Sequence, residues 1–190
     1  MTENLKVRLV PRSLVDGERV VARRAAEDLV LVLAEDFPDR IEMVAPSEDD
    51  EERFLAGLIN TRAEPGLELT RHDVAGTELL MLSGESYFTA THALWANEFD
   101  PPEPEHGTLV AVPTRQVVLA HPIRDRGALA VLTPMLQLAR RFGAAGEQGT
   151  ISPNLYLLRG GQLQLIELEE TETQIVLPQT GEFAQLLQQL

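Results

Sequence analysis

The chain of 190 residues carries 30 acidic and 16 basic side chains, which gives a formal net charge of −14. This length suits one domain with its own hydrophobic core, and a hydrophobic content of 44% is typical of a globular protein. Cysteine is absent, which excludes disulfides, thiolate metal sites and cysteine nucleophiles. No apolar run approaches the roughly 18 residues of a membrane span, and the first residues do not resemble a secretory leader, so we expect a cytoplasmic protein.

The acidic balance also limits the class of partner. Nucleic-acid binding depends on lysine and arginine side chains that neutralise phosphates, and the densest basic clusters here are two pairs, Arg23–Arg24 and Arg140–Arg141. We therefore expect neither a nucleic-acid nor a membrane partner. A protein with a basic face, or a second copy of this chain, is the expected partner because complementary fields favour association.

The predicted elements begin with strands. Residues 5–10 alternate apolar and charged side chains, which is typical of a half-buried strand. A short strand is predicted within 20–24. A continuous apolar run at 29–34 and a further strand at 41–44 indicate a hairpin whose first strand is central in its sheet.

The first helix is predicted over 47–62. Ser47 and Asp50 have the spacing of a capping box, and the acids that follow suit the positive end of the helix dipole. A hairpin over 67–82 comes next. The buried face of the helix is expected to consist of Phe54, Leu55, Leu58 and Ile59.

A second helix is predicted over 84–99, because the proline-rich linker that follows cannot continue it. Strands at 109–112 and 116–120 are expected after the linker. A third helix is predicted over 125–142, where Pro134 should kink or split it.

The C-terminal part is predicted to begin with a hairpin. Gly160 and Gly161 form a turn between apolar segments at 155–158 and 163–168. A short C-terminal helix is spaced to dock on the body of the protein. Its apolar side chains are Phe183, Leu186, Leu187 and Leu190.

The order of these elements indicates the fold class. Strands come in consecutive pairs with helices inserted between the pairs, which favours an α+β fold over a doubly wound α/β fold. We expect a single α+β domain over 1–190. Its sheet should be mainly antiparallel or mixed, built from hairpins with three to four helices inserted between them.

One segment offers a candidate site. On a helix over 85–99, four side chains would fall within a narrow sector and place an imidazole in an aromatic stripe. They are Phe88, His92, Trp95 and Phe99. A histidine there is most often a core residue. The alternative is a ligand pocket along this helix and the turn at 113–115, formed by Glu85, Tyr87, His92, Trp95 and Arg115.

Signals for metal binding or catalysis are weak. The four histidines are scattered singly, without the spacing of a zinc site, and no phosphate-loop or nucleophile-elbow motif is found. We expect neither a metal nor a cofactor. The lack of an assembled catalytic set favours a protein that is not an enzyme.

Four segments, in order and with similar spacing, carry a family resemblance. They are Leu29 to Asp39, Glu85 to Ala90, Val110 to Arg115 and Ile151 to Tyr156. Together they cover roughly residues 20–168 and resemble the uncharacterised bacterial YtpQ-like family. Longer members carry an extra N-terminal helical region, so the chain resembles a reduced form. The resemblance implies a bacterial protein and supplies no activity, cofactor or site residues.

Two functions of different classes fit the sequence. The favoured one is a protein-interaction or binding module of unknown partner. The alternative is a small-ligand-binding protein or enzyme with its pocket along the 85–99 helix and the 113–115 turn. The surroundings of His92 separate the two, because a cavity open to solvent supports the alternative and a filled core supports the interaction module.

Overall fold

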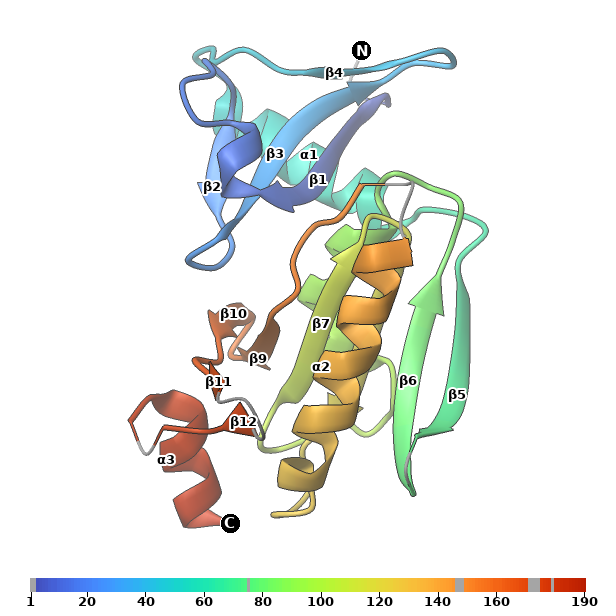
Figure 1. The fold of residues 1–190 in the computed structure, drawn as a ribbon. Helices are drawn as coiled ribbons and strands as arrows, with labels where there is room; N and C mark the ends of the chain where they lie inside the picture. The colour runs from blue at the N-terminus through green and yellow to red at the C-terminus, as the bar shows by residue number, and fades with distance from the viewer. Residues whose placement is uncertain (1–2, 75, 146–148, 171–174, 179) are drawn as a thin grey trace.

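The structure is a computed structural model that describes residues 3–74, 76–145, 149–170, 175–178 and 180–190. It has the predicted α+β fold, with antiparallel strand pairing throughout the described sheets. A four-stranded sheet near the N-terminus and a six-stranded sheet dominate the molecule, and the two termini lie at opposite ends of it (Figure 1). No helix in the described part of the chain is long and apolar enough to cross a membrane.

The N-terminal sheet is centred on β3 (Leu29–Asp36). Strand β1 (Leu5–Pro11) pairs along one edge of β3, while β2 (Ala22–Arg24) and β4 (Ile41–Met43) pair along the other. A short 3₁₀ helix, η1 (Arg12–Leu14), follows β1. The prediction of a central strand is confirmed, and the continuous apolar run of β3 fits a strand with partners on both edges and buried faces.

Helix α1 (Asp50–Arg62) follows this sheet and packs along β1. The predicted helix start at Ser47 was wrong, because the helix begins at Asp50. Half of the predicted capping box is present in the turn before the helix, where the backbone N–H of Ser47 donates to Asp50 Oδ1 at 3.0 Å.

The buried face of α1 also differs from the predicted one. Its buried residues are Phe54, Gly57 and Thr61. Gly57 lies so close to the sheet that an added Cβ would be 2.8 Å from Leu33 Cδ1. Leu55 and Ile59, predicted to be buried, are 59% and 61% exposed. The prediction failed because it counted large apolar side chains, whereas a glycine and a threonine allow the closest approach of helix and sheet.

The six-stranded sheet has the order β10-β9-β7-β8-β6-β5. Its strands are β5 (Glu68–Val74), β6 (Thr77–Ser83), β7 (Thr108–Thr114), β8 (Val117–Pro122), β9 (Leu155–Arg159) and β10 (Gln162–Leu165). The hairpins predicted over 67–82 and 155–168 therefore form, and the strands predicted at 109–112 and 116–120 pair as β7 and β8. Gly160 and Gly161 take positive φ angles of 56° and 75° in the β9–β10 turn, a conformation that glycine adopts without strain. Two short strands, β11 (Glu169–Glu170) and β12 (Ile175–Val176), pair separately.

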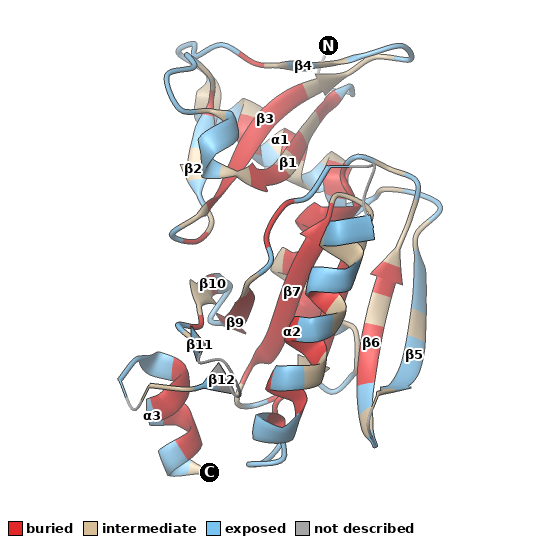
Figure 2. Ribbon diagram, viewed as in Figure 1, coloured by how far each residue is buried: buried red, intermediate tan, exposed pale blue. Residues whose placement is uncertain are grey.

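The two faces of this sheet pack against different layers, because alternate residues of a strand point to opposite faces. On β7, Val110 and Val112 join a core cluster with the N-terminal sheet, while Leu109 and Ala111 pack with α2 (Ala128–Ala145). Figure 2 shows β7 buried along its length and α2 exposed on its outer side. The helix is continuous through Pro134, so the predicted split is absent.

The C-terminal helix α3 (Glu182–Gln189) docks on the same core cluster as α2. The predicted docking is confirmed by its buried residues, Phe183, Ala184, Leu186 and Leu187. The apolar face of this helix is therefore covered by the body of the protein.

The segment between β6 and β7 corrects a further prediction. An α-helix over 84–99 was expected, but the chain forms turns and then a 3₁₀ helix, η2 (Thr89–Glu98), with non-helical angles at Trp95. At three residues per turn, Ala90, Ala93 and Ala96 share one face, and all three are buried in the core cluster between the two sheets. Small side chains at this spacing let the narrow helix fit between the layers.

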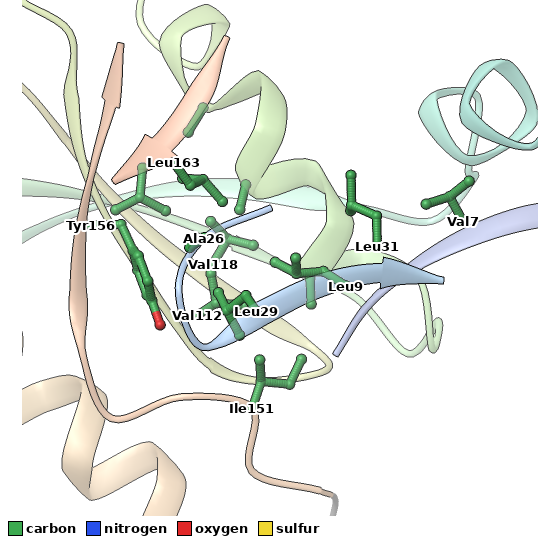
Figure 3. Packing of buried hydrophobic residues seen from close by; sticks show 14 of the residues in the cluster. Val7, Leu9, Ala26, Leu29, Leu31, Val112, Val118, Ile151, Tyr156 and Leu163 are labelled. Carbon is green, nitrogen blue, oxygen red and sulfur yellow. The ribbon is translucent and has the colours of Figure 1, made fainter. Parts of the chain in front are cut away.

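Both sheets thus contribute to one core around η2. Figure 3 shows Leu9 and Leu29 of the N-terminal sheet packed near Val112, Val118 and Tyr156 of the six-stranded sheet. The helix contacts β1 on one side and β7, β8 and β9 on the other.

Candidate functional site

The five residues predicted to line one pocket separate into two places. His92 is only 7% exposed, and its ring packs edge-on against Trp95 with 5.2 Å between the ring centroids. Burial lowers the pKa of His92, and the nearby backbone carbonyls of Phe88, Thr89 and Arg62 offset this only in part. Neither ring nitrogen makes a well-aligned hydrogen bond to a described residue. His92 is therefore a neutral, enclosed side chain. This fits a core histidine rather than a pocket residue.

Tyr87 and Arg115 lie together elsewhere, joined by a residue that the sequence analysis did not select. The Cζ atom of Arg115 is 3.8 Å from the centroid of the Tyr87 ring, and that of Arg8 is 5.7 Å from it. Tyr87 is 44% exposed. Glu85 is exposed nearby, and its backbone oxygen accepts a hydrogen bond from Gln116 Nε2. We call Arg8, Tyr87 and Arg115 the arginine pair with its ring.

The arginine pair is unusual in having no acidic partner. Two residues earlier on β1, the Nζ of Lys6 lies 2.6 Å from Glu64 and 3.0 Å from Asp36. Within the described residues, Arg8 and Arg115 form no ion pair, and the Nε atom of each is buried without a hydrogen-bond partner. Burial and the like charge of Arg115 both lower the pKa of Arg8.

A groove lies between the N-terminal sheet and the β9–β10 hairpin. Its volume is about 560 Å³, and an adjoining hollow of about 410 Å³ shares Leu31 and Leu94 with it. We call the two together the groove. Leu31, Leu94 and Leu163 give it apolar walls. Arg24 of β2 and Gln164 of β10 also line it, and each of these strands pairs with a single described strand. The groove is therefore lined by residues of two edge strands.

Hydrogen-bond acceptors dominate the polar lining of the groove. The carboxylates that line it are Glu27, Glu98, Glu103 and Glu182. Among its described lining residues Arg24 is the only cation, and it lies 3.9 Å from Glu27. Gln164 Oε1 and Asn97 Oδ1 are buried with no donor from a described residue. A ligand that brings positive charge would meet complementary carboxylates in this lining.

A third polar cluster joins the two sheets. Asp28, just before β3, accepts hydrogen bonds at Oδ2 from Tyr156 Oη at 2.7 Å, Asn154 Nδ2 at 2.9 Å and Ser152 Oγ at 3.1 Å. Burial, reinforced by Asp28, raises the pKa of Tyr156. The Tyr156 ring lies among core side chains in Figure 3. We call this the Asp28 cluster, and its dense bonding fits a structural role.

Sequence reasoning missed Arg8 and Asp28 for different reasons. Arg8 occupies an ordinary charged position of an alternating strand, and only the topology brings β1 beside Tyr87. Asp28 had a partial signal, since the segment 151–156 carries its partners Ser152 and Tyr156 and is one of the four segments of the family resemblance.

Comparison with protein-family models, curated proteins and solved structures finds no match for this chain. In the described residues, no group of three or more His, Cys, Asp or Glu side chains is placed to hold a metal ion. The groove and the arginine pair with its ring are therefore the two candidate binding sites.

Proposed function

We propose that this protein is a protein-interaction module that binds an extended, basic segment of a partner protein in the groove. The observation that carries the proposal is the combination of apolar walls, residues of two edge strands and a lining rich in carboxylates. The resemblance to the YtpQ-like family, itself a hypothesis, names no activity, so the proposal rests on this geometry.

The sheet edges favour an extended segment. Strand β10 (Gln162–Leu165) is the last strand of its sheet, and β2 (Ala22–Arg24) is at the edge of the other. An edge strand presents backbone N–H and C=O groups that an added strand can pair with. Alternate side chains of such a segment would then point into the apolar groove and out toward its rim.

The charges favour a basic segment. Four carboxylates line the groove against one arginine, so lysine or arginine side chains at the rim would meet complementary charge. The exposed rim pairs already present, such as Arg62 with Glu98 at 2.6 Å, contribute little because solvent and salt screen them. Apolar burial would supply most of the affinity, and the charges would supply selectivity and faster association.

Trp95 provides a direct test, because it is the single tryptophan of the chain and lines the groove. The probe is a peptide of alternating lysine and valine, titrated against the full chain while tryptophan emission is recorded. We expect a saturable shift of the emission to shorter wavelength as water leaves the groove. A matched peptide of alternating glutamate and valine should produce no shift.

Charge reversal at the rim sharpens this test. Glu27→Lys combined with Glu182→Lys should weaken binding about ten-fold, because each exposed charge contributes roughly 0.5 to 1 kcal/mol. Glu52→Lys makes the charge change of one of these two substitutions on the exposed side of α1, outside the groove, and should leave the affinity unchanged. An equal loss of affinity in the double variant and in Glu52→Lys, or no response of Trp95 to either peptide, would refute the proposal.

A second copy of the chain is the competing occupant. Sedimentation of the wild-type protein tests it, because pairing of β10 edges between two copies would give a concentration-dependent dimer. A dimer that the lysine–valine peptide does not dissociate would assign the groove to self-association instead.

A further inference from the structure

The arginine pair with its ring does not line the groove and needs its own explanation. Arg8 extends from β1, and Arg115 occupies the turn between β7 and β8. Both guanidinium groups approach the Tyr87 ring, with Cζ atoms 5.7 and 3.8 Å from its centroid. Segments far apart in sequence thus bring two positive charges to one partly exposed aromatic side chain.

Two neighbouring cations without an acid are costly in the unliganded protein. Like charges repel, and burial removes water from the guanidinium groups. The chain has 30 acidic residues, and on the same strand Lys6 contacts two of them. The ring offers each arginine a cation–π contact, which is worth about 0.5 to 1 kcal/mol at exposed sites and leaves the N–H donors free. Such a pair is suited to an anion that both guanidinium groups can reach.

We propose that Arg8 and Arg115 bind a phosphate monoester beside the ring of Tyr87. A phosphate monoester carries a charge of about −1.5 to −2 at neutral pH and three acceptor oxygens, which matches two guanidinium groups more closely than a carboxylate does. Arginine presents planar pairs of donors that fit phosphate oxygens, and both arginines are partly exposed to solvent.

The net charge of −14 does not prevent this binding. At an ionic strength of 0.15 M, interactions between exposed charges are screened over about 8 Å, so the groups closest to the anion decide its affinity. Of the acids near this segment, Asp36 and Glu64 are bound to Lys6, and Glu85 forms no ion pair with Arg8 or Arg115 in the described residues.

The test uses the full chain with inorganic phosphate and phenyl phosphate as probes, followed by calorimetry and by phosphorus NMR at neutral pH. We expect saturable binding of both, with phenyl phosphate binding more tightly if its ring adds contact with Tyr87, and weaker binding of acetate. Arg8→Gln and Arg115→Gln should each lower phosphate affinity about ten-fold or more, as expected for the loss of charge-assisted hydrogen bonds.

Controls keep the outcome interpretable. Arg126→Gln removes one exposed positive charge outside the site and should change phosphate affinity less than two-fold, on the order expected for a screened charge. Arg115→Lys retains charge without the planar fork and should give an intermediate affinity. Thermal melting checks that each variant is folded. No saturable phosphate binding, or the same loss in Arg126→Gln as in Arg115→Gln, would overturn the proposal. Because none of these residues lines the groove, peptide binding in the Trp95 experiment stands or falls separately.

Discussion

The Asp28 cluster and the arginine pair with its ring are both polar groups at contacts between segments distant in sequence, but they differ in how far their hydrogen bonds are satisfied. Asp28 Oδ2 accepts three hydrogen bonds of 2.7 to 3.1 Å, while the buried Oδ1 of the same carboxylate has no partner among the described residues. Arg8 and Arg115 have no acceptor among the described residues for their buried Nε atoms. Polar groups whose partners lie within the fold support the fold, whereas a group left without a partner needs an explanation, of which a ligand is one.

His92 makes the comparison more exact. Its ring nitrogens also lack well-aligned partners, but it is 7% exposed and packed against Trp95, so a ligand has no direct access to it. Lack of a partner is therefore informative about binding only where the group can also be reached. Arg8 and Arg115 differ from His92 in being partly exposed beside the 44% exposed Tyr87, although their Nε atoms are buried.

The largest expected effect is a loss of stability when the Asp28 cluster is disrupted. Asp28→Ala would leave three donors in a partly buried site without their acceptor, and we expect a loss of about 3 kcal/mol in the free energy of unfolding. Urea denaturation measures it. Asp28→Asn, which retains one acceptor oxygen, should lose less. The neighbouring exposed Glu27→Ala should stay within about 0.5 kcal/mol of wild type. A loss below about 1 kcal/mol for Asp28→Ala would mean that the cluster does not hold the layers together.

An intermediate effect is expected from His92 and depends on pH. Its folded-state pKa lies below the unfolded value of about 6.5, so its neutral form favours folding above that pH, and this contribution is lost as the pH falls toward the folded pKa. Between pH 7 and pH 5 the wild-type protein should lose about 1 kcal/mol more stability than His92→Leu. Equal slopes for wild type and His92→Leu would show that the imidazole is hydrated.

The smallest expected effect is a gain in stability rather than a loss. Arg8→Met keeps an apolar stem while removing a charge that has no acid partner, so we expect the unliganded protein to gain up to about 1 kcal/mol in stability. Lys6→Met, two residues away on the same strand, should instead be destabilising, because Asp36 and Glu64 would lose their shared cation. Chemical denaturation of both variants without phosphate measures the contrast. Destabilisation by both would show that Arg8 has a structural role.

Sequence reasoning predicted the fold more fully than the candidate sites. Turn glycines and apolar alternation locate hairpins because they depend on neighbours in sequence, as at Gly160 and Gly161. The 3₁₀ helix was missed because the prediction used 3.6 residues per turn. The spacing of Ala90, Ala93 and Ala96 instead fits three residues per turn. The aromatic stripe that seemed to centre on His92 was a consequence of that assumption.

The sites depend on contacts that no local pattern encodes. Tyr87 and Arg115 were selected and do lie together, whereas Arg8 joins them only through the pairing of β1 with β3 and its packing beside η2. The groove likewise arises from two sheets whose relative placement is set by long-range packing. The acidic composition predicted that the proposed partner is positively charged. The location of its binding site could be found only from the fold.

The row of alanines on η2 has a consequence for how this protein can diverge. Ala93 is buried between the two sheets, while its neighbours Leu94 and Trp95 line the groove. The smallest side chains of the interior thus fix the spacing of the layers and, through it, the width of the groove. Exchange of one alanine for valine would widen that spacing at a position that touches no ligand. Selection for a bulkier or slimmer partner can therefore act in the interior, leaving the rim chemistry as it is.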